Sequence, residues 1–441
     1  MASKKPKGMT AFTIIWVGQL VSLMGSAMTQ FAMGIWAWQK TGQATPLAMV
    51  GFFAFTPMII ITPIAGVLVD RWNRKLVMAL SDLGAGLSTI FMLVFLLSDS
   101  MEMWHVYVAV AFAGIFGAFQ WPAYSAAISL MIPKKQYGRA SGMISLAQTG
   151  SGIFAPILAG ILIGSIDIAG IFIIDLVTLG FALFMLLIVK VPATPVVDAA
   201  SEGRGSFFKE MAYGFRYLFE RSSLLGLQMV FFFGNFFCSI AFSLITPMVL
   251  ARTGGNATIL GSTQTAAAIG GLLGSLILTA WGGPKKRIHG VLIGWTLLGL
   301  FGLFLYGITG SLPVWLAASF LGMLVNPIVN GSNQAIWQAK VAPEVQGRVF
   351  SVRRLVAQIT APLSMLIAGP LADQVLEPAM QNPDSTLAKI IAPVMGTGEG
   401  VGMAVIVAVS GIIVALVGLG AYNFPKIRNV ETILPDHDAV T

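Results

Sequence analysis

The sequence predicts an all-α integral membrane protein with twelve transmembrane helices in two six-helix pseudo-repeat bundles. The first observation behind this prediction is composition, because 56% of the 441 residues are hydrophobic and only 10% are charged. A soluble domain averages about 25% charged residues, and a soluble fold this apolar lacks the polar side chains to cover its surface. The other two observations are a regular series of long apolar segments and an internal repeat that relates the two halves.

Twelve apolar segments each have about the 20 residues that a helix needs to span a bilayer. They lie at 11–33, 46–68, 76–98, 104–131, 140–163, 168–190, 224–250, 257–281, 288–309, 312–337, 348–371 and 401–423. The polar stretch 191–222 separates the first six from the last six, and its second half (Phe207 to Phe219) is expected to form a short amphipathic surface helix. The predicted domains are the N-terminal bundle 1–190, the cytoplasmic linker 191–222, the C-terminal bundle 223–424 with an outer loop at 373–400, and the cytoplasmic tail 425–441.

The basic residues predict the orientation. With the N-terminus placed in the cytoplasm, 23 of the 26 Lys and Arg residues lie on the inner side or close to it, and the outer loops hold only Lys40, Arg252 and Lys389. This asymmetry follows the positive-inside rule, so we expect a multi-pass protein of the cell (inner) membrane with both termini cytoplasmic. The same distribution explains the net charge of +8 without a nucleic-acid partner.

The two halves of the chain share a pattern of turn and packing residues. The segment after the fourth span contains Gly138-Arg139, and the segment after the tenth contains Gly347-Arg348. In each half an Ala-Gly pair follows, and its glycine (Gly160 or Gly369) lies 22 residues after the glycine of the Gly-Arg pair. Parallel six-helix halves of this kind are the arrangement of one large class of transporters.

Patterns typical of enzymes are missing from the sequence. It contains no phosphate-binding loop of the form Gly-x-x-x-x-Gly-Lys-Ser/Thr, so ATP is not expected to drive the protein. The three histidines (His105, His289 and His437) are scattered near span ends or in the tail, so no metal site is expected. The single cysteine, Cys238, excludes a disulfide framework within the chain. We therefore expect neither an enzyme nor a cofactor-binding protein.

Polar side chains recur at helical spacing inside four of the spans. In spans 1, 4, 7 and 10, amides, hydroxyls or aromatic groups share one helix face. The candidates for substrate contact are Gln19, Ser26, Gln30, Gln120, Trp121, Tyr124, Asn235, Ser239, Asn326, Asn330 and Asn333. Hydrogen bonding between helices in lipid is the alternative explanation. Because these stripes carry no charge, they fit a bulky amphipathic substrate better than a small ion.

Two carboxylates lie well inside predicted spans, Asp82 in the third and Asp175 in the sixth. Ionisable groups inside a membrane are costly and mark candidate functional positions. Asp82 and Asp175 are therefore the candidates for proton coupling, and a purely structural hydrogen bond is the alternative role for each.

The loop between the second and third spans contains Gly66-Val-Leu-Val-Asp70-Arg71-Trp-Asn73-Arg74-Lys75 and resembles the loop signature of the major facilitator superfamily. The resemblance extends over nearly the whole chain. Further segments are similar to the macrolide-efflux and enterobactin-exporter branch, among them Trp38-Gln-Lys-Thr41-Gly42, Gly347-Arg348-Val-Phe-Ser-Val-Arg353-Arg354 and Ala368-Gly369-Pro370-Leu-Ala-Asp373. The resemblance implies the major facilitator fold, in which helices 1, 4, 7 and 10 line a central cavity.

The resemblance also assigns two further groups of residues. In the fifth span, Ser151, Ala155, Pro156 and Gly160 are similar to the exporter-associated motif Gly-x-x-x-Gly-Pro-x-x-Gly-Gly, and simple helix packing is the alternative role. The gating candidates are Gly66, Asp70, Arg71, Arg74, Lys75, Arg139 and Arg348. In the family, the acid at the position of Asp70 meets the start of the eleventh helix, here expected near Glu344–Arg348, when the inner side is closed. The alternative is that Asp70 caps the third helix.

The function predicted from these features is secondary active transport by alternating access. The resemblance favours a proton-coupled exporter, an antiporter that removes a drug, a macrolide-like compound or a siderophore and so supports multidrug resistance. The expected partners are the lipid bilayer, a small-molecule substrate and protons, and the protein is expected to be a monomer. A lysophospholipid flippase or an uptake symporter of the same fold is an alternative, and a non-transporting membrane sensor or scaffold is an alternative from another class.

Overall fold

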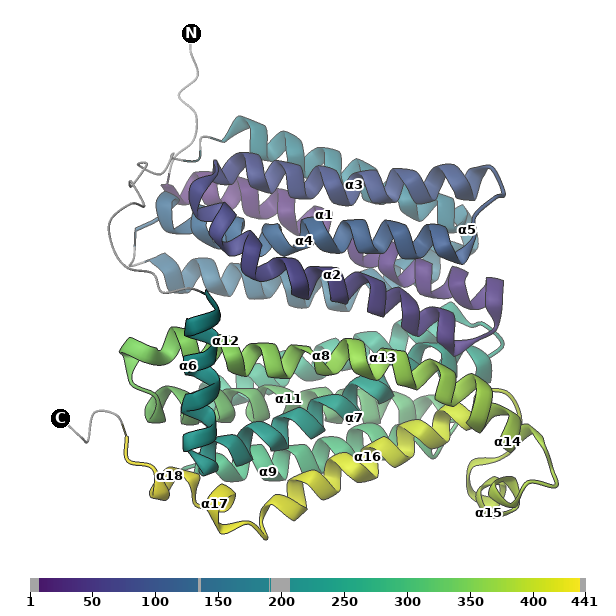
Figure 1. Cartoon of the computed structure of the whole chain (residues 1–441). Coiled ribbons are helices and arrows are strands. Elements are labelled where there is room, and N and C mark those ends of the chain that lie inside the picture. Colours follow the sequence, from purple (N-terminus) through teal and green to yellow (C-terminus); the bar gives the residue numbers. More distant parts are fainter. Residues whose placement is uncertain (1–7, 134–135, 190, 192–206, 437–441) are drawn as a thin grey trace. The chain divides into compact units, whose positions relative to one another are not determined.

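The computed structural model describes residues 8–133, 136–189, 191 and 207–436, and nearly all of them are helical. The helices are shown in Figure 1 and are, in chain order, α1 (Gly8–Thr41), α2 (Ala44–Arg71), α3 (Arg74–Leu97), α4 (Met103–Met131), α5 (Tyr137–Ile188), α6 (Phe207–Glu220), α7 (Ser222–Arg252), α8 (Ala257–Trp281), α9 (Arg287–Leu297), η2 (Leu298–Phe304), α10 (Leu305–Gly307), α11 (Leu312–Lys340), α12 (Pro343–Gln358), α13 (Thr360–Pro370), η3 (Leu371–Leu376), α14 (Glu377–Gln381), α15 (Thr386–Met395), α16 (Val401–Ala421), α17 (Pro425–Arg428) and α18 (Val430–Ile433). Within the described residues, 11 helices are long and apolar enough to cross a membrane. The predicted all-α membrane class is confirmed.

The expected fifth and sixth spans lie within the single element α5, which is why 11 candidate spans are found and not 12. α5 has 52 residues, and at about 1.5 Å per residue it is more than twice as long as a bilayer core of roughly 30 Å. Its backbone leaves the helical conformation at Asp167, where φ is 57° and ψ is −179°. This kink lies between the two segments predicted as spans, 140–163 and 168–190. Twelve separate helices and a structural repeat stay predictions.

Contacts divide the chain into two compact units. Unit 1 comprises Met1–Gly42, Met49–Ala200 and Gly255–Thr265, and unit 2 comprises Gln43–Ala48, Ser201–Gly254 and Ala266–Thr441. Two helices contribute to both units. The first turn of α2 belongs to unit 2 and the rest to unit 1, whereas α8 begins in unit 1 and continues in unit 2.

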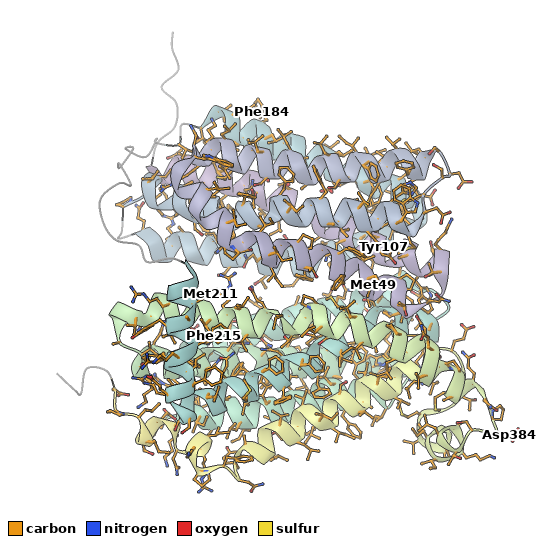
Figure 2. The ribbon with its side chains drawn as sticks, viewed as in Figure 1. Met49, Tyr107, Phe184, Met211, Phe215 and Asp384 are labelled. Atoms are coloured by element: carbon orange, nitrogen blue, oxygen red, sulfur yellow. The ribbon has the colours of Figure 1, made fainter. Side chains whose placement is uncertain are left out.

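In unit 1, the helices α1, α3, α4 and α5 meet in one apolar core. Phe12, Met78 and Leu186 lie in this core and are fully buried. Small residues bring the helices close together, since a Cβ on Gly25 of α1 would lie 3.0 Å from Cα of Asp175 in α5. Large apolar side chains such as Phe184 instead project outward from the unit, where lipid can cover them (Figure 2).

In unit 2, α16 packs closely against α7, α9 and η2. A Cβ on Gly299 of η2 would lie 2.5 Å from the backbone nitrogen of Ala415 in α16. A Cβ on Gly302 would likewise lie 2.9 Å from Cα of Gly322 in α11. Backbones that approach this closely are typical of helices packed in a membrane, where small residues take the place of a hydrophobic driving force.

Two surface elements complete unit 2. The expected amphipathic helix is present as α6, and it packs on α12, because a Cβ on Gly214 would lie 2.8 Å from the carbonyl oxygen of Arg348. The predicted outer loop contains two helices, α14 and α15, that the sequence did not predict. Between them lies Asp384, whose side chain is almost fully exposed (Figure 2).

Candidate functional site

The first candidate site in unit 1 surrounds Asp82 of α3, which is 8% exposed. The side-chain amide of Gln19 (α1) donates to Oδ2 of Asp82 at 3.0 Å, and the amide of Gln120 (α4) donates to Oδ1 at 2.8 Å. Gln120 also donates to the side-chain oxygen of Gln19 at 3.1 Å. Side chains from three helices therefore form one closed triangle of hydrogen bonds. Two of the predicted substrate contacts, Gln19 and Gln120, are hydrogen-bond donors to Asp82.

The second candidate site surrounds Asp175 of α5, which is 5% exposed. The hydroxyl of Ser26 (α1) donates to Oδ1 and the hydroxyl of Thr89 (α3) donates to Oδ2, both at 3.0 Å. Gly25 makes the approach of α1 to this carboxylate possible, because a Cβ there would lie 3.1 Å from Oδ1 of Asp175. The sequence singled out Ser26 but not Thr89.

Both carboxylates are held by neutral donors. Among the ion pairs of the described residues, none involves Asp82 or Asp175. An amide or hydroxyl group can donate to a charged carboxylate, and through its oxygen it can accept from a protonated one. The two sites can therefore accommodate the carboxyl group in either protonation state.

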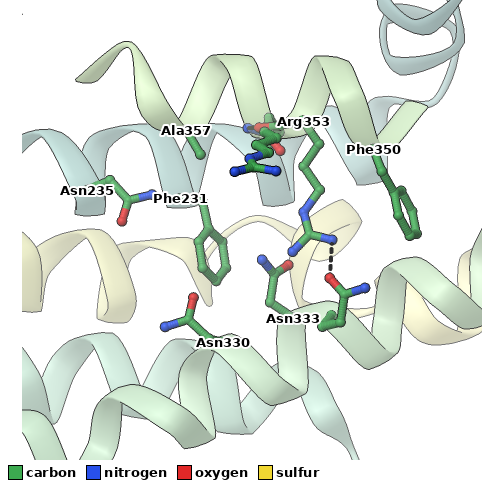
Figure 3. A pocket seen from close by; sticks show the side chains of 10 residues that line it. Phe231, Asn235, Asn330, Asn333, Phe350, Arg353 and Ala357 are labelled. Atoms are coloured by element: carbon green, nitrogen blue, oxygen red, sulfur yellow. Dashed lines mark hydrogen bonds between the residues drawn. The ribbon is translucent and has the colours of Figure 1, made fainter. Parts of the chain in front are cut away.

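Unit 2 contains a cavity of about 310 Å³ between α7, α11 and α12 (Figure 3). Amides, two phenyl rings and two guanidinium groups surround it. The residues that line it are Gln228, Phe231, Asn235, Asn330, Asn333, Gln334, Phe350, Arg353, Arg354 and Ala357. Three predicted substrate contacts, Asn235, Asn330 and Asn333, are thus brought together from two helices that lie far apart in the sequence.

The guanidinium of Arg353 contacts three other residues at this cavity. Its Nη1 donates to the side-chain oxygen of Gln334 at 2.8 Å (Figure 3). Its guanidinium carbon lies 5.3 Å from the ring centroid of Trp337 and 5.7 Å from that of Phe350. The indole of Trp337 is in turn fixed, because its Nε1 donates to Oδ1 of the buried Asn333 at 3.0 Å.

The remaining predicted substrate contacts lie outside these clusters. Gln30 is exposed on α1, and Trp121 on α4 is 49% exposed. Tyr124 is buried in the core of unit 1. Ser239 does not line the cavity of unit 2, and Asn326 contributes to it only indirectly by accepting two hydrogen bonds from Asn330.

The prediction missed the charged side of the cavity, because it considered only the stripes on spans 1, 4, 7 and 10. Phe350, Arg353, Arg354 and Ala357 occupy positions i, i+3, i+4 and i+7 of α12. That spacing places the four residues on one helix face, so the sequence alone could have predicted that they share a surface. The polar stripes without charge are therefore only part of the lining.

The gating candidates are described only in part. The side chains of Asp70 and Arg71 and the surroundings of Gly66 lie outside the described residues. Lys75 donates to the carbonyl oxygens of Leu187 and Val189 at 3.0 and 2.7 Å, at the end of α5. α3 is capped by Asn73, whose Oδ1 accepts from the N–H groups of Lys75 and Leu76, so α3 already has a side-chain cap without Asp70.

The other gating candidates lie at helix starts. Arg74 opens α3, and Arg139 is exposed in the first turn of α5. Arg348 lies in the first half of α12 with its guanidinium 5.5 Å from the ring of Tyr213 in α6. α12 begins at Pro343, next to the predicted start of the eleventh helix.

The packing motif of the fifth span contacts the start of α8. A Cβ on Gly160 would lie 3.1 Å from the carbonyl oxygen of Ala257, and a Cβ on Gly261 would lie 2.7 Å from that of Pro156. Ala155 is fully buried, and Ser151 bonds back to its own helix at the carbonyl of Ala147. Small residues on both helices thus let α5 and α8 approach closely within unit 1.

A carboxylate in unit 2 binds the start of α2. Oδ1 of Asp373 accepts from the N–H of Ala44 at 2.9 Å, and Oδ2 accepts from the N–H of Thr45 at 2.7 Å. The first N–H groups of a helix have no partner within the helix, and the helix dipole attracts a negative charge there. The sequence had marked Asp373 as part of a family match and as the first residue of the predicted outer loop, but not as a contact of α2.

Comparison with protein families decides between the remaining classes. The model of the Major Facilitator Superfamily matches residues 15–365. The chain belongs to the Major Facilitator Superfamily. It is therefore a membrane transporter of small molecules and not an enzyme, as the sequence predicted.

Several curated proteins that are similar to this chain are named as efflux proteins or exporters. The macrolide efflux protein A of Streptococcus pyogenes is 28% identical over 377 residues, which cover 82% of this chain and 90% of the relative. The multidrug efflux pump Tap of Mycolicibacterium fortuitum is 26% identical and covers 82% of this chain and 88% of its own length. The enterobactin exporter EntS of Citrobacter koseri is 21% identical, with 69% and 71% covered.

Solved structures of the superfamily share the fold. A bacterial homolog of the human lysosomal transporter Spinster, in an inward-facing and occupied conformation, superposes with a TM-score of 0.66 at 16% identity over 96% of this chain and 98% of that one. A bacterial homologue of the iron transporter ferroportin, in an inward-facing state, gives a TM-score of 0.65 at 15% identity over 93% and 97%.

Proposed function

We propose that the protein is a proton-coupled exporter of amphipathic small molecules that works by alternating access. The observation that carries the proposal is the pair of buried carboxylates in unit 1, Asp82 and Asp175, each held by neutral side chains from α1. The names of the curated relatives, which include macrolide, multidrug and enterobactin exporters, support outward transport.

The proton coupling follows from the neutral partners. A carboxylate inside a membrane protein that is paired with Lys or Arg tends to stay charged, whereas one held by amides and hydroxyls can exchange its proton. Gln19 and Ser26 lie seven residues apart on α1, so both carboxylates act on the same helix. A change in the protonation of either one alters hydrogen bonds to α1 directly. We therefore assign proton binding to these two sites.

Transport measurements test this proposal. Cells with and without the protein are compared for accumulation of erythromycin, of the neutral amphiphilic dye Nile red and of the anionic amphiphile 11-(dansylamino)undecanoate, with and without an uncoupler. We expect lower accumulation of at least one probe with the protein, and we expect the uncoupler to abolish the difference. Asp82→Asn and Asp175→Asn are assayed in parallel, with Asp384→Asn in the exposed loop as the control.

At least one of the two buried substitutions is expected to abolish gradient-driven transport at an unchanged protein level, while Asp384→Asn behaves as the wild type. Efflux that persists in the uncoupler, or full transport by both buried variants, would remove these carboxylates from the mechanism.

A further inference from the structure

We propose that the cavity between α7, α11 and α12 binds the anionic group of an amphipathic substrate, with Arg353 and Arg354 as its cationic contacts. This inference rests on the proposed function, since it names the chemical class of the exported molecule. It also departs from the uncharged cavity that the polar stripes alone predict.

The first argument is charge. Two guanidinium groups line the cavity, and none of its ten lining residues is Asp or Glu. A cation that is partly withdrawn from water is costly unless something compensates it, and its usual compensation in a membrane protein is a carboxylate or a backbone carbonyl. In the cavity, the guanidinium of Arg353 has only the neutral amide of Gln334 as a described hydrogen-bond partner. A bound anion would supply the missing negative charge.

The second argument is preorganisation. The guanidinium of Arg353 lies near two aromatic rings, at 5.3 Å from Trp337 and 5.7 Å from Phe350. Asn333 holds the indole of Trp337 through a hydrogen bond of 3.0 Å, and both residues are buried. These contacts orient Arg353 without neutralising it. A guanidinium has five N–H donors in a planar fork, which matches the two oxygens of a carboxylate or phosphate group.

The third argument is the apolar part of the lining. Phe231, Phe350 and Ala357 face the same cavity as the two arginines (Figure 3). A volume of about 310 Å³ lies at the lower end of the range for small-molecule sites. The combination fits one compact anionic group, a carboxylate, a phosphate or an acidic phenol, attached to an apolar body. It disfavours a cationic amphiphile such as erythromycin, whose amino sugar would meet like charge.

Binding to the full chain in lipid nanodiscs tests this inference without any proton gradient. The probe is 11-(dansylamino)undecanoate, the neutral comparison is its methyl ester, and the cationic comparison is erythromycin. We expect Arg353→Gln to weaken binding of the carboxylate about tenfold or more, because a hydrogen bond to a charged group contributes about 1.5–3 kcal/mol. Binding of the ester should not change. Arg354→Gln should have a smaller effect in the same direction.

Matched variants separate charge from fold. Arg353→Lys retains the charge and should keep part of the preference for the acid over the ester. Arg428→Gln removes a guanidinium from α17, which contributes no residue to the cavity lining, and should bind both probes as the wild type does. Equal affinities for acid and ester in the wild type would overturn the proposal, as would an acid preference that survives Arg353→Gln and Arg354→Gln together.

Competition identifies the source of the anion. Displacement of the probe by dodecyl phosphate but not by lysophosphatidylglycerol supports a soluble anion as the substrate. Displacement by both means that the site also accepts an anionic lipid. Displacement by neither contradicts the anion site. Failure of this proposal and failure of the proposed function are distinguishable. Uncoupler-sensitive efflux with no acid preference would overturn only the anion site, whereas acid-selective binding without gradient-driven efflux would overturn only the proton-coupled transport.

Discussion

The starts of α2 and α8 are packed alike but capped differently. An Ala-Gly pair lies against each of them: a Cβ on Gly369 would lie 2.5 Å from Cα of Thr45 in α2, and one on Gly160 would lie 3.1 Å from the carbonyl oxygen of Ala257 in α8. The alanines of both pairs, Ala368 and Ala159, are fully buried. At both positions, the glycine that repeats in the sequence therefore packs closely against the start of a helix.

The caps differ in chemistry. At α8, the side chain of Asn256, directly before the helix, accepts from the N–H of Ile259 at 3.1 Å. At α2, the carboxylate of Asp373, more than 300 residues away in the chain, accepts from two N–H groups. Asp373 stands four residues after Gly369, whereas Gly164 stands four residues after Gly160. The packing is thus duplicated, but the charge is present in one copy only.

The segment that carries Asp373 also forms hydrogen bonds with the start of a second helix, α16. Glu377 lies one turn later and accepts from the N–H groups of Gly400 and Met403 at 3.2 and 2.8 Å, at the start of α16. Carboxylates at two successive turns therefore bind the starts of α2 and α16. Asp373 joins α2 to a segment more than 300 residues away, whereas Asn256 caps the helix that it directly precedes. We therefore expect Asp373 to influence the equilibrium between transport conformations, and Asn256 to affect only the stability of α8.

Asp373 also has a counterpart in the sequence. The pattern Gly-x-Leu-x-Asp occurs at Gly66–Asp70 and again at Gly369–Asp373. The distribution of Lys and Arg predicts that the first lies on the cytoplasmic side and the second on the outer side. We therefore expect the two acids to favour closure of opposite sides of the membrane, Asp70 the inner side and Asp373 the outer side.

The first test concerns topology, because the comparison requires Asp70 and Asp373 to lie on opposite sides of the membrane. The expected labelling is all or none. In a Cys238→Ala background, a cysteine at Ser385 should react completely with a membrane-impermeant maleimide added outside intact cells, and a cysteine at Ser201 should not. The reason is that residues 373–400 carry few basic side chains. Labelling of position 201 with protection of 385 would invert both sides of the comparison.

Matched glycine substitutions test the packing. Gly369→Ala places a Cβ 2.5 Å from a backbone carbon, so the helices must separate, and we expect most transport to be lost. Gly160→Ala meets a carbonyl oxygen at 3.1 Å, which requires only a small shift, and should retain most activity. Size-exclusion profiles of the solubilised proteins control for folding. Equal losses in the two variants would contradict the inference that the contact at Gly369 is the tighter of the two.

Loss of the caps tests the difference in charge. Asp373→Ala removes two hydrogen bonds at a helix start and should cost about 0.5–2 kcal/mol, and Asp373→Asn, which retains one acceptor, should cost less. Asn256→Ala should lower the thermal stability of the solubilised protein by a similar amount while transport per folded molecule stays unchanged. If Asn256→Ala impairs transport as much as Asp373→Ala, the distinction between the two caps is wrong.

The smallest expected effect concerns the polar stripe. Asn330 lines the cavity of unit 2, whereas Gln30 lies on an exposed face of α1 outside it. Asn330→Ala should weaken the affinity for the transported probe by about 1 kcal/mol, the typical value of one hydrogen bond, without changing protein level. Gln30→Ala should have less effect. A parallel loss of folded protein and transport in Asn330→Ala would assign the stripe to helix packing.

Much of the fold was predictable, because hydrophobic runs and basic loops depend on local composition. The kink at Asp167 was expected only as a span boundary, since positive φ at a single aspartate leaves no mark in hydropathy. Less of the candidate site than of the fold could be predicted from the sequence. Gln19, Ser26 and Gln120 were chosen as substrate contacts, but they donate to Asp82 and Asp175, because partners 38 to 149 residues apart are set by packing and not by spacing. The contact of Asp373 with α2 spans even more of the chain.

Distance measurements between spin labels test the opposed roles of the two acids most directly. In the Cys238→Ala background, one pair of labels at Ser98 and Ser311 reports the predicted outer side, and a second pair in the segments 72–75 and 343–348 reports the predicted inner side. A change of 1–2 kcal/mol shifts a two-state population by about 5- to 30-fold, which such distributions resolve. Asp373→Ala should lengthen the outer distances and shorten the inner ones, and Asp70→Asn should do the reverse. Unchanged distributions in both variants, or shifts in the same direction, would contradict the proposal that the two acids close opposite sides.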